Sequence, residues 1–123
     1  MKKRILLVED ERDLNDLIKE FLEHNNFEVI PAYDGKEAME KVQEGPDLII
    51  LDLMLPKLDG REVLKRLKYD PKTKYIPVVI LTARGESKII FEAMEAGSFD
   101  YLIKPFDNKE LFDTISRALK LSS

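Results

Sequence analysis

The chain has 123 residues, which is the usual size of one domain with one hydrophobic core. Its 20 Lys and Arg residues stand against 24 Asp and Glu residues, so the formal net charge of -4 argues against direct binding of nucleic acid. The chain has no cysteine and one histidine, which excludes a disulfide framework, a thiolate metal site and a metal site made of histidines. We therefore expect a single domain that spans residues 1–123.

The amino terminus carries three basic residues before the first apolar run, which covers only residues 5–8. Such a run is far shorter than the apolar core of a signal peptide or a membrane-spanning helix. We therefore expect a cytoplasmic protein that does not insert into a membrane.

Short apolar runs alternate along the chain with segments of helical periodicity, which is typical of a parallel sheet covered by helices. The first strand is predicted at residues 5–8. Apolar residues then recur at helical spacing, which predicts an amphipathic helix that ends near Asn25 and Asn26. The residues predicted on the apolar face of this helix are Leu14, Leu17, Ile18, Phe21 and Leu22.

The second and third strands are predicted at residues 29–32 and 48–51. Between them, Asp34 can cap a helix and Glu37 can reach back to the start of the same helix. Gly45, which is followed by a proline, ends this helix. The run at 48–51 is apolar without interruption, as expected of a central strand that is covered on both faces.

Two more strands are predicted at residues 78–81 and 101–103, together with three more helices. The helix before the fourth strand ends at the turn that contains Asp70, and the next helix ends at its C-terminal glycine, Gly97. The apolar positions predicted for the three helices are Val63, Leu64 and Leu67, then Ile90, Ala93 and Met94, and finally Leu111, Phe112, Ile115, Ala118 and Leu119 behind the capping pair Asp107 and Glu110.

Polar residues follow four of the five predicted strands. Glu9 and Asp10 follow the first strand, and Asp52 follows the third. Thr82 follows the fourth strand, and Lys104 follows the fifth. Because the carboxyl ends of parallel strands meet at one edge of a sheet, we expect these side chains to converge on one site.

Three carboxylates that converge repel one another unless a cation lies among them or their pKa values rise. The group therefore predicts a divalent metal site. Lys104 adds a positive charge and Thr82 adds a hydroxyl donor, which indicates that an anionic group is held beside the metal. Mg²⁺ with a phosphoryl group is the simplest interpretation, because Mg²⁺ typically takes one or two carboxylates, water and phosphate oxygens, and Mn²⁺ is the alternative cation.

In their order, spacing and placement at strand ends, these motifs resemble the receiver domain of bacterial two-component response regulators, and the resemblance extends from end to end of the chain. It implies a doubly wound α/β fold of the flavodoxin-like type, with a five-stranded parallel sheet in the order 2-1-3-4-5 and five helices. The residues that carry the resemblance are Glu9 and Asp10, Asp52 with Leu53, Met54, Leu55 and Pro56, Asp59 with Gly60, Thr82 with Ala83, Tyr101, and Lys104 with Pro105 and Phe106.

The resemblance implies that Asp52 accepts a phosphoryl group from a phosphohistidine on a sensor histidine kinase or a phosphotransfer protein. Asp10, Asp52 and the backbone carbonyl of Met54 would bind Mg²⁺, and Glu9 would assist through a water molecule of the metal. The chain would then be a phosphoacceptor that assists its own phosphorylation and dephosphorylation, and not an enzyme with a separate substrate.

Further roles also follow from the resemblance. Lys104 would neutralise one phosphoryl oxygen, and the Thr82 hydroxyl with the Ala83 amide would bind another. The peptide bond between Lys104 and Pro105 would be cis and would aim the lysine inward. As a switch, Thr82 would move toward the phosphoryl group and Tyr101 would fill the space left behind.

A switch of this kind needs a surface that a partner can read. Ile89 and Phe91 flank the apolar stripe of the fourth helix, and together with Tyr101 they form the candidate partner surface for an unidentified protein effector. The segment of residues 68–77 is longer than in many DNA-binding regulators of this family, which favours a stand-alone regulator similar to those of chemotaxis or phosphorelays.

Each of these residues also has a simpler interpretation. A strand-end aspartate such as Asp52 commonly forms a turn or caps a helix. Thr82 suits a strand because it is β-branched, Lys104 can be a solvated charge, and Tyr101 can serve packing alone. The simpler interpretations do not explain why Asp52, Thr82 and Lys104 recur at one end of the sheet.

Other classes of function fit the motifs less well. A flavodoxin-like cofactor site would not place Glu9 and Asp10 beside a phosphate, and a phosphatase of the haloacid dehalogenase type would carry a second aspartate where this chain has Met54. A P-loop nucleotide enzyme needs a Gly-Lys-Ser/Thr motif that the chain lacks. The alternative that remains open is a phosphorylation-independent, receiver-like interaction scaffold.

Overall fold

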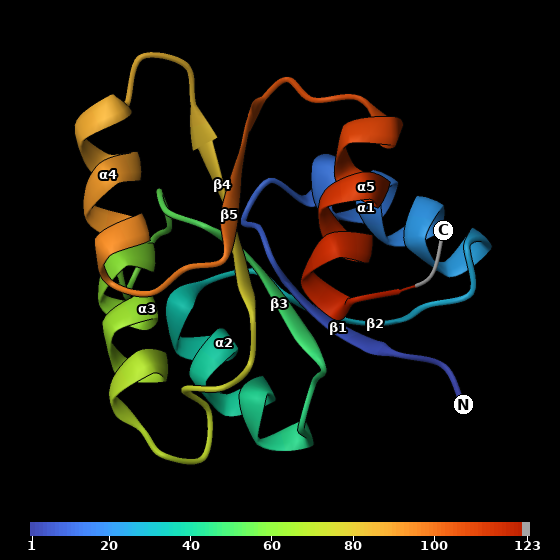
Figure 1. Cartoon of the computed structure of the whole chain (residues 1–123), viewed down its shortest axis with the longest axis horizontal. Coiled ribbons are helices and arrows are strands. Elements are labelled where there is room, and N and C mark those ends of the chain that lie inside the picture. The colour runs from blue at the N-terminus through green and yellow to red at the C-terminus, as the bar shows by residue number, and fades with distance from the viewer. Residues whose placement is uncertain (122–123) are drawn as a thin grey trace.

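The computed structural model describes residues 1–121, which form a parallel sheet with helices on both faces (Figure 1). The sheet has five strands in the order β2-β1-β3-β4-β5, and every neighbouring pair is parallel. The predicted sheet order is therefore confirmed. The strands are Arg4–Val8 (β1), Glu28–Ala32 (β2), Leu48–Asp52 (β3), Val78–Ala83 (β4) and Asp100–Lys104 (β5).

Five α-helices connect and follow the strands, as predicted. The starts of three of them are set by aspartate caps that the sequence shows. Asp34 accepts a hydrogen bond from Glu37 N at 2.8 Å, and Asp107 and Glu110 form a complete capping box. The helices are Arg12–His24 (α1), Gly35–Lys41 (α2), Gly60–Tyr69 (α3), Ser87–Glu95 (α4) and Asn108–Leu119 (α5), with a 3-10 turn at Val42–Glu44 (η1) after α2.

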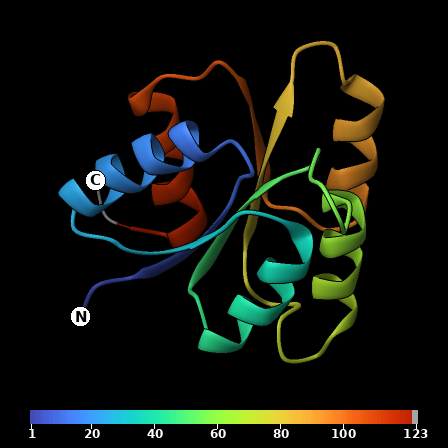
Figure 2. The ribbon, with the colours of Figure 1, turned by 180° about the vertical axis from the view of Figure 1, so that it is seen from behind.

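The helices form two layers around the sheet. Helices α2, α3 and α4 cover one face, and α1 and α5 cover the other (Figures 1 and 2). The first four residues of β3 are fully buried, and their side chains alternate between the two faces: Ile49 and Leu51 pack toward α2 and α3, whereas Leu48 and Ile50 pack toward α1 and α5. This burial explains the unbroken apolar run of β3 and holds its carboxyl end rigidly.

Two predicted core positions are wrong. Leu17 has 66% of its surface exposed, because the buried residues of α1 are Asn15, Ile18 and Leu22, and Leu17 lies on another side of the helix. Met94 is 38% exposed on α4. The apolar periodicity indicated the right helices and placed Ile18 and Leu22 correctly, but neighbouring residues lie about 100° apart around a helix axis, so it did not fix how wide the buried stripe is.

The loop after β3 is anchored by Gly60, the first residue of α3. A Cβ atom at this position would collide with the backbone oxygen of Asp52, so only glycine allows the helix to begin directly against the end of β3. Asp59 caps the same helix by accepting a hydrogen bond from Arg61 N at 2.8 Å. This close approach places the loop that contains Met54 over the carboxyl edge of the sheet.

Among residues 1–121, none of the helices combines the length and the apolar character that a membrane crossing requires.

Candidate functional site

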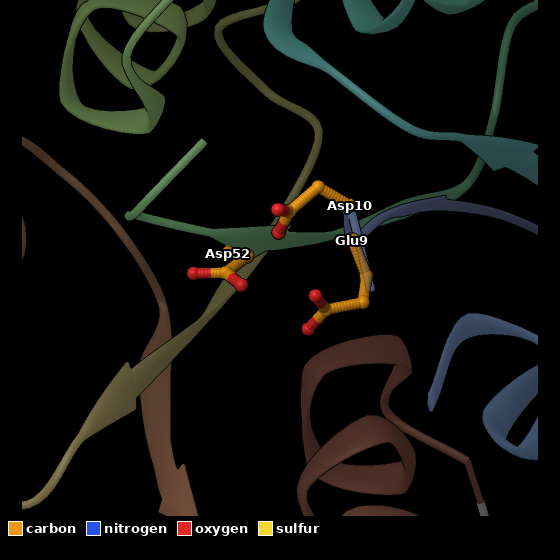
Figure 3. A group of neighbouring side chains, drawn as sticks. All are labelled: Glu9, Asp10 and Asp52. Carbon is orange, nitrogen blue, oxygen red and sulfur yellow. The ribbon is translucent and has the colours of Figure 1, made fainter. Parts of the chain in front are cut away.

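Three acidic side chains converge at the carboxyl edge of the sheet. Glu9 and Asp10 follow β1, and Asp52 is the last residue of the adjacent strand β3. One carboxylate oxygen of each residue lies within 4.8 Å of those of the other two (Figure 3). Glu9 is 0% exposed and Asp52 is 3% exposed, whereas Asp10 is exposed, so the cluster has a buried floor and an open side.

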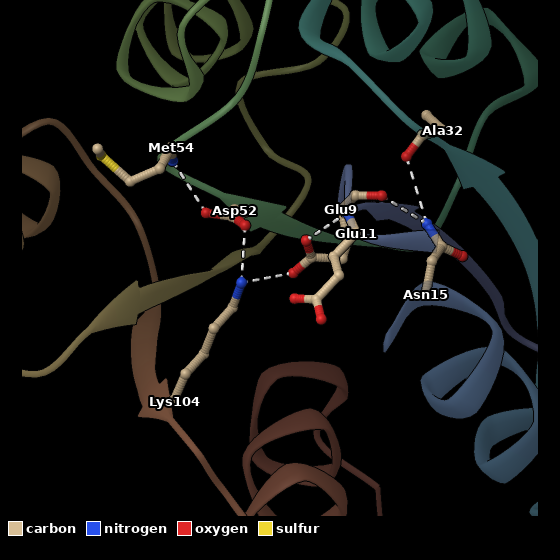
Figure 4. A network of polar contacts seen from close by, with 7 residues as sticks. All are labelled: Glu9, Glu11, Asn15, Ala32, Asp52, Met54 and Lys104. Carbon is tan, nitrogen blue, oxygen red and sulfur yellow. Dashed lines mark hydrogen bonds and ion pairs between the residues drawn. The ribbon is translucent and has the colours of Figure 1, made fainter. Parts of the chain in front are cut away.

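Lys104, the last residue of β5, reaches into this cluster. Its Nζ donates a hydrogen bond to Asp52 Oδ2 at 2.8 Å and lies 2.7 Å from Glu9 Oε1 (Figure 4). The peptide bond between Lys104 and Pro105 is cis. One ammonium group therefore faces three carboxylates, and the site keeps an excess of negative charge that favours a further cation.

The remaining contacts of the buried carboxylates come from the backbone. Asp52 Oδ1 accepts a hydrogen bond from Met54 N at 2.9 Å, and Glu9 Oε2 accepts one from Glu11 N at 3.0 Å (Figure 4). Glu9 Oε1 is buried and touches the ammonium of Lys104 as an ion pair, but among the described residues it accepts no well-aligned hydrogen bond. This oxygen keeps unused acceptor capacity inside the site.

Burial shifts the protonation of Glu9. The pKa of Glu9 is raised from 4.5 to about 7 as the net result of several effects. Desolvation by burial is the largest and raises the pKa, the contacts with Lys104 and with the Glu11 amide lower it, and the nearby charge of Asp52 raises it. For Lys104, burial alone would lower the pKa, but the interactions with Asp52 and Glu9 outweigh burial and raise the pKa above 10.5. The ammonium thus stays charged at neutral pH, whereas Glu9 can lose or gain a proton there.

This donor set fits a divalent cation with a preference for oxygen. It consists of carboxylates only, one of its buried oxygens contacts Lys104 as an ion pair and keeps further acceptor capacity, and its open side leaves room for water or a ligand. Mg²⁺ binds sites of this composition through a small number of carboxylates while it keeps several waters. Asp10, Asp52 and Glu9 are the side chains that could hold it.

The other predicted site residues lie at the same edge or close to it. Thr82 and Ala83 are the last two residues of β4, and Ala83 pairs in register with Lys104 on β5. Thr82 is buried and Ala83 is exposed. Met54 follows Asp52 by two residues, and its side chain is exposed. The structure therefore brings the predicted phosphoryl-binding residues to one edge of the sheet.

The residues of the candidate partner surface do not share one environment. Phe91 on α4 is 65% exposed, whereas Ile89 on the same helix is half-buried and packs against the core on that face of the sheet. Tyr101 lies in β5, three residues before Lys104. It is partly exposed and pairs in register with Ile80 of β4.

Sequence reasoning missed one residue at the site, Asn15. It is fully buried, and its side-chain Nδ2 donates a hydrogen bond to Glu9 O at 3.0 Å (Figure 4). The signal was available, because Asn15 lies three residues before Ile18 and seven before Leu22 on the buried stripe of α1. A buried polar side chain on an apolar stripe is expected to have a hydrogen-bond partner, and Asn15 has one in Glu9 O.

The sequence is similar to those of known regulators. Residues 5–116 match the family model described as the response regulator receiver domain. The chain is 43% identical over 119 residues to the transcriptional regulatory protein CpxR of Escherichia coli K12, a match that covers 97% of this chain and 50% of that protein. It is 42% identical over 121 residues to the phosphate regulon transcriptional regulatory protein PhoB of the same strain, covering 98% and 53%. The chain thus spans about half the length of the curated relatives it matches.

The fold is also similar to those of solved structures. A response regulator receiver domain protein from Clostridium thermocellum superposes with a TM-score of 0.89 at 32% identity, over 96% of this chain and 94% of that one. The chemotaxis protein CheY4 of Vibrio cholerae superposes with a TM-score of 0.90 at 29% identity, over 97% of this chain and 100% of that one.

Proposed function

The chain belongs to the response regulator receiver domain family, and from this premise we propose that it is a signalling switch that accepts a phosphoryl group on Asp52. The observation that carries the proposal is the position of Asp52: it is buried, it lies within the acidic cluster, and one of its oxygens is hydrogen-bonded to Lys104. Transfer would form an O–P bond on Asp52 as the N–P bond of a phosphohistidine breaks, and the released imidazole would keep or take up a proton.

Asp10, Asp52 and the backbone carbonyl of Met54 would hold Mg²⁺, or Mn²⁺ in its place, and Glu9 would contact a water of the cation. When bound, the cation supplies positive charge beside the phosphoryl oxygens, where negative charge must be stabilised in the transition state. The support for this site is the convergence of three carboxylates, which only the one ammonium group of Lys104 compensates among the contacts of the site.

The chain's own donors would complete the neutralisation. Lys104 already lies 2.8 Å from Asp52 Oδ2, so its ammonium would remain beside a phosphoryl group formed on that carboxylate. The Thr82 hydroxyl and the Ala83 amide, from the neighbouring strand, would bind another oxygen. A donor that is already in place, as Lys104 is, would accelerate transfer because it needs no rearrangement as charge develops.

The switch would link this site to a surface that a partner reads. Thr82 would move toward the phosphoryl group and Tyr101 would fill the vacated space, which would alter the surface around Phe91 and Ile89. Contacts that exist only in the phosphorylated state are what shift the equilibrium between the two conformations. Under this proposal, Phe91→Ala weakens the binding of an effector and leaves the phosphorylation of Asp52 unchanged, whereas unchanged effector affinity would remove Phe91 from the surface.

The partners that this function requires are a sensor histidine kinase or a phosphotransfer protein as donor and a protein effector as reader. We propose that the described domain acts in the cytoplasm, without direct contact of its own to nucleic acid. The relatives CpxR and PhoB are named as transcriptional regulatory proteins. The expectation of one domain over residues 1–123 remains a proposal.

The decisive test is intact-mass spectrometry after incubation with Mg²⁺ and acetyl phosphate, on the wild type and on Asp52→Ala. A gain of one phosphoryl group in the wild type alone is the expected result. No gain in the wild type would favour the alternative function, a phosphorylation-independent interaction scaffold, whose partner binding would then be the same with and without acetyl phosphate.

A further inference from the structure

Asn15 is a buried polar residue beside the site that the proposed chemistry does not use. It lies at the end of the first turn of α1 and is 0% exposed. Its Nδ2 donates hydrogen bonds to two main-chain oxygens, to Glu9 O at 3.0 Å and to Ala32 O at 3.4 Å (Figure 4). The side-chain amide thus joins the residue after β1 to the last residue of β2, and we call this pair of hydrogen bonds the Asn15 clamp.

The clamp acts on the residue that carries the buried carboxylate. Glu9 N donates to the same oxygen of Ala32 at 3.0 Å, so both main-chain polar groups of Glu9 are held. The N–H group is held by the end of β2, and the carbonyl group is held by Asn15 from α1. Because β1 ends at Val8, the ladder of the sheet no longer restrains this position from both sides.

The restraint matters because the carboxylates of the site repel one another. The carboxylates of Glu9, Asp10 and Asp52 lie within 4.8 Å of one another, and one ammonium group compensates them. Without a cation, this repulsion favours conformations in which the segment after β1 turns away from β3. A fixed main chain at Glu9 opposes that movement.

Asn15 also has a buried oxygen that costs folding free energy, which an apolar residue at this position would avoid. Its Oδ1 is buried and, among the described residues, accepts no hydrogen bond. A buried acceptor without a donor destabilises the folded state, and an aliphatic side chain on this stripe would not incur that penalty. The two donated hydrogen bonds are therefore what the residue contributes.

We propose that Asn15 is a positioning residue for the divalent-cation site: it fixes the main chain of Glu9 so that the carboxylates of Glu9 and Asp10 face Asp52 before a cation binds. The inference rests on the cation site of the proposed function. The role is indirect, because Asn15 acts through the backbone of Glu9, in the way that outer-shell partners orient metal ligands.

The test compares Asn15→Val with Asn15→Thr. Valine and threonine have nearly the same shape, but threonine has a hydroxyl where valine has a methyl group. The Thr hydroxyl can donate to Glu9 O, whereas Val cannot. We expect Asn15→Val to raise the Mg²⁺ dissociation constant, measured by titration calorimetry on the whole chain, by roughly tenfold, and Asn15→Thr to raise it less. The rate of phosphorylation by acetyl phosphate at saturating Mg²⁺ should change much less than the dissociation constant.

Thr73→Val is the matched control for lost stability. It removes a buried hydrogen bond, from Thr73 Oγ1 to Leu67 O at 2.6 Å, in the loop before β4 at the opposite end of the sheet. It should lower the free energy of unfolding in urea and leave the Mg²⁺ dissociation constant unchanged. A dissociation constant raised equally by Thr73→Val and Asn15→Val would overturn the inference, because stability alone would then explain the effect.

Two further results would also overturn it. One is an Asn15→Val protein that binds Mg²⁺ within about twofold of the wild type, well below the loss expected of an outer-shell partner. If Asn15→Val does not fold, Asn15→Ala, which also lacks a hydrogen-bond donor, decides in its place, and an unchanged dissociation constant has the same meaning. A wild type that binds no Mg²⁺ refutes the inference, whereas a wild type that binds Mg²⁺ but gains no phosphoryl group refutes the proposed function alone.

Discussion

The two ends of the sheet both bury polar groups, but they use them differently. In the loop between α3 and β4, at the amino end of β4, the hydroxyl of Thr73 donates to Leu67 O at 2.6 Å, and Lys68 Nζ donates to Lys74 O at 3.1 Å. These side chains meet backbone acceptors that have no partner in the sheet. Their hydrogen bonds close the loop and serve the stability of the fold.

At the carboxyl end, the buried polar groups are charged and only partly paired. Glu9 and Asp52 share the single ammonium of Lys104, and the side-chain oxygen of Asn15 accepts no hydrogen bond among the described residues. Like charges and unpaired acceptors cost folding free energy, yet they suit a site that binds a cation and a phosphoryl group. Contacts that serve stability therefore lie at the amino end of the sheet, and the groups that serve function lie at its carboxyl end.

The largest effect that tests this separation is expected from Lys104→Met. The rate of phosphorylation by acetyl phosphate should fall on the order of 100-fold, because a fixed donor to the phosphoryl group is lost. The affinity for Mg²⁺ should rise at the same time, because the ammonium no longer competes for the carboxylates of Glu9 and Asp52. Mass spectrometry over time and titration calorimetry measure the two quantities.

Lys109→Met is the control, since it removes an exposed lysine of α5 that pairs with Asp113. It should change neither quantity. A fall in Mg²⁺ affinity for Lys104→Met would contradict competition between the ammonium and the cation.

The second effect concerns pH in the absence of cations. Because burial raises the pKa of Glu9 from 4.5 to about 7, the folded chain binds more protons than the unfolded chain between these values. The stabilisation from the protonated carboxyl is complete below pH 4.5 and is lost as the pH rises through 7. The free energy of unfolding should therefore fall by on the order of 2 kcal/mol across this range.

Urea unfolding in the presence of EDTA measures this loss, and Glu9→Gln provides the reference at each pH. The glutamine variant has no carboxyl at this position and should lack the decrease. The same decrease in both proteins would assign it to other groups.

A smaller effect is expected from Lys68→Met at the amino end. The variant keeps most of the apolar stem but removes the donor to Lys74 O and Ile76 O, which lie 3.1 and 2.9 Å from Nζ. Burial lowers the pKa of Lys68, so the cost of desolvation already offsets part of the gain, and we expect a loss of about 1 kcal/mol in urea unfolding. Phosphorylation should be unchanged; a slower rate would break the separation between the two ends.

The smallest effect is expected from Lys19→Ala on the exposed side of α1. Lys19 and Glu23 form an ion pair at 3.0 Å that solvent screens. The free energy of unfolding should change by no more than about 0.5 kcal/mol. A larger loss in urea unfolding would show that surface charges, and not only the buried ones of the site, contribute to the stability of this fold.

The sequence predicted the strands and helix caps because their signals are local. An apolar run between turn residues marks each strand, and Asp34 and Asp107 cap helices through residues only three positions away. Strand-end placement of Asp52, Thr82 and Lys104 followed from the same pattern once parallel order was assumed.

Prediction failed where neighbouring elements decide which side of a helix is buried. Leu17 was expected in the core and is exposed, whereas Asn15 was overlooked and is fully buried. Helical periodicity placed Ile18 and Leu22 on the buried stripe, but the packing of α1 against the sheet decides how far the stripe extends around the helix. The polar Asn15 fits the stripe because its amide donates hydrogen bonds to two strand-end carbonyls.

By itself the sequence determined the order of strands and helices, their caps and the acidic character of one sheet edge, because these depend on patterns that extend over a few residues. Only the tertiary structure decided that Lys104 contacts both Glu9 and Asp52, that Glu9 is buried deeply enough to raise its pKa to about 7, and that Asn15 holds the ends of β1 and β2. These features depend on distances, desolvation and donor alignment between segments far apart in the chain, and such quantities exist only after the sheet and its helices have packed.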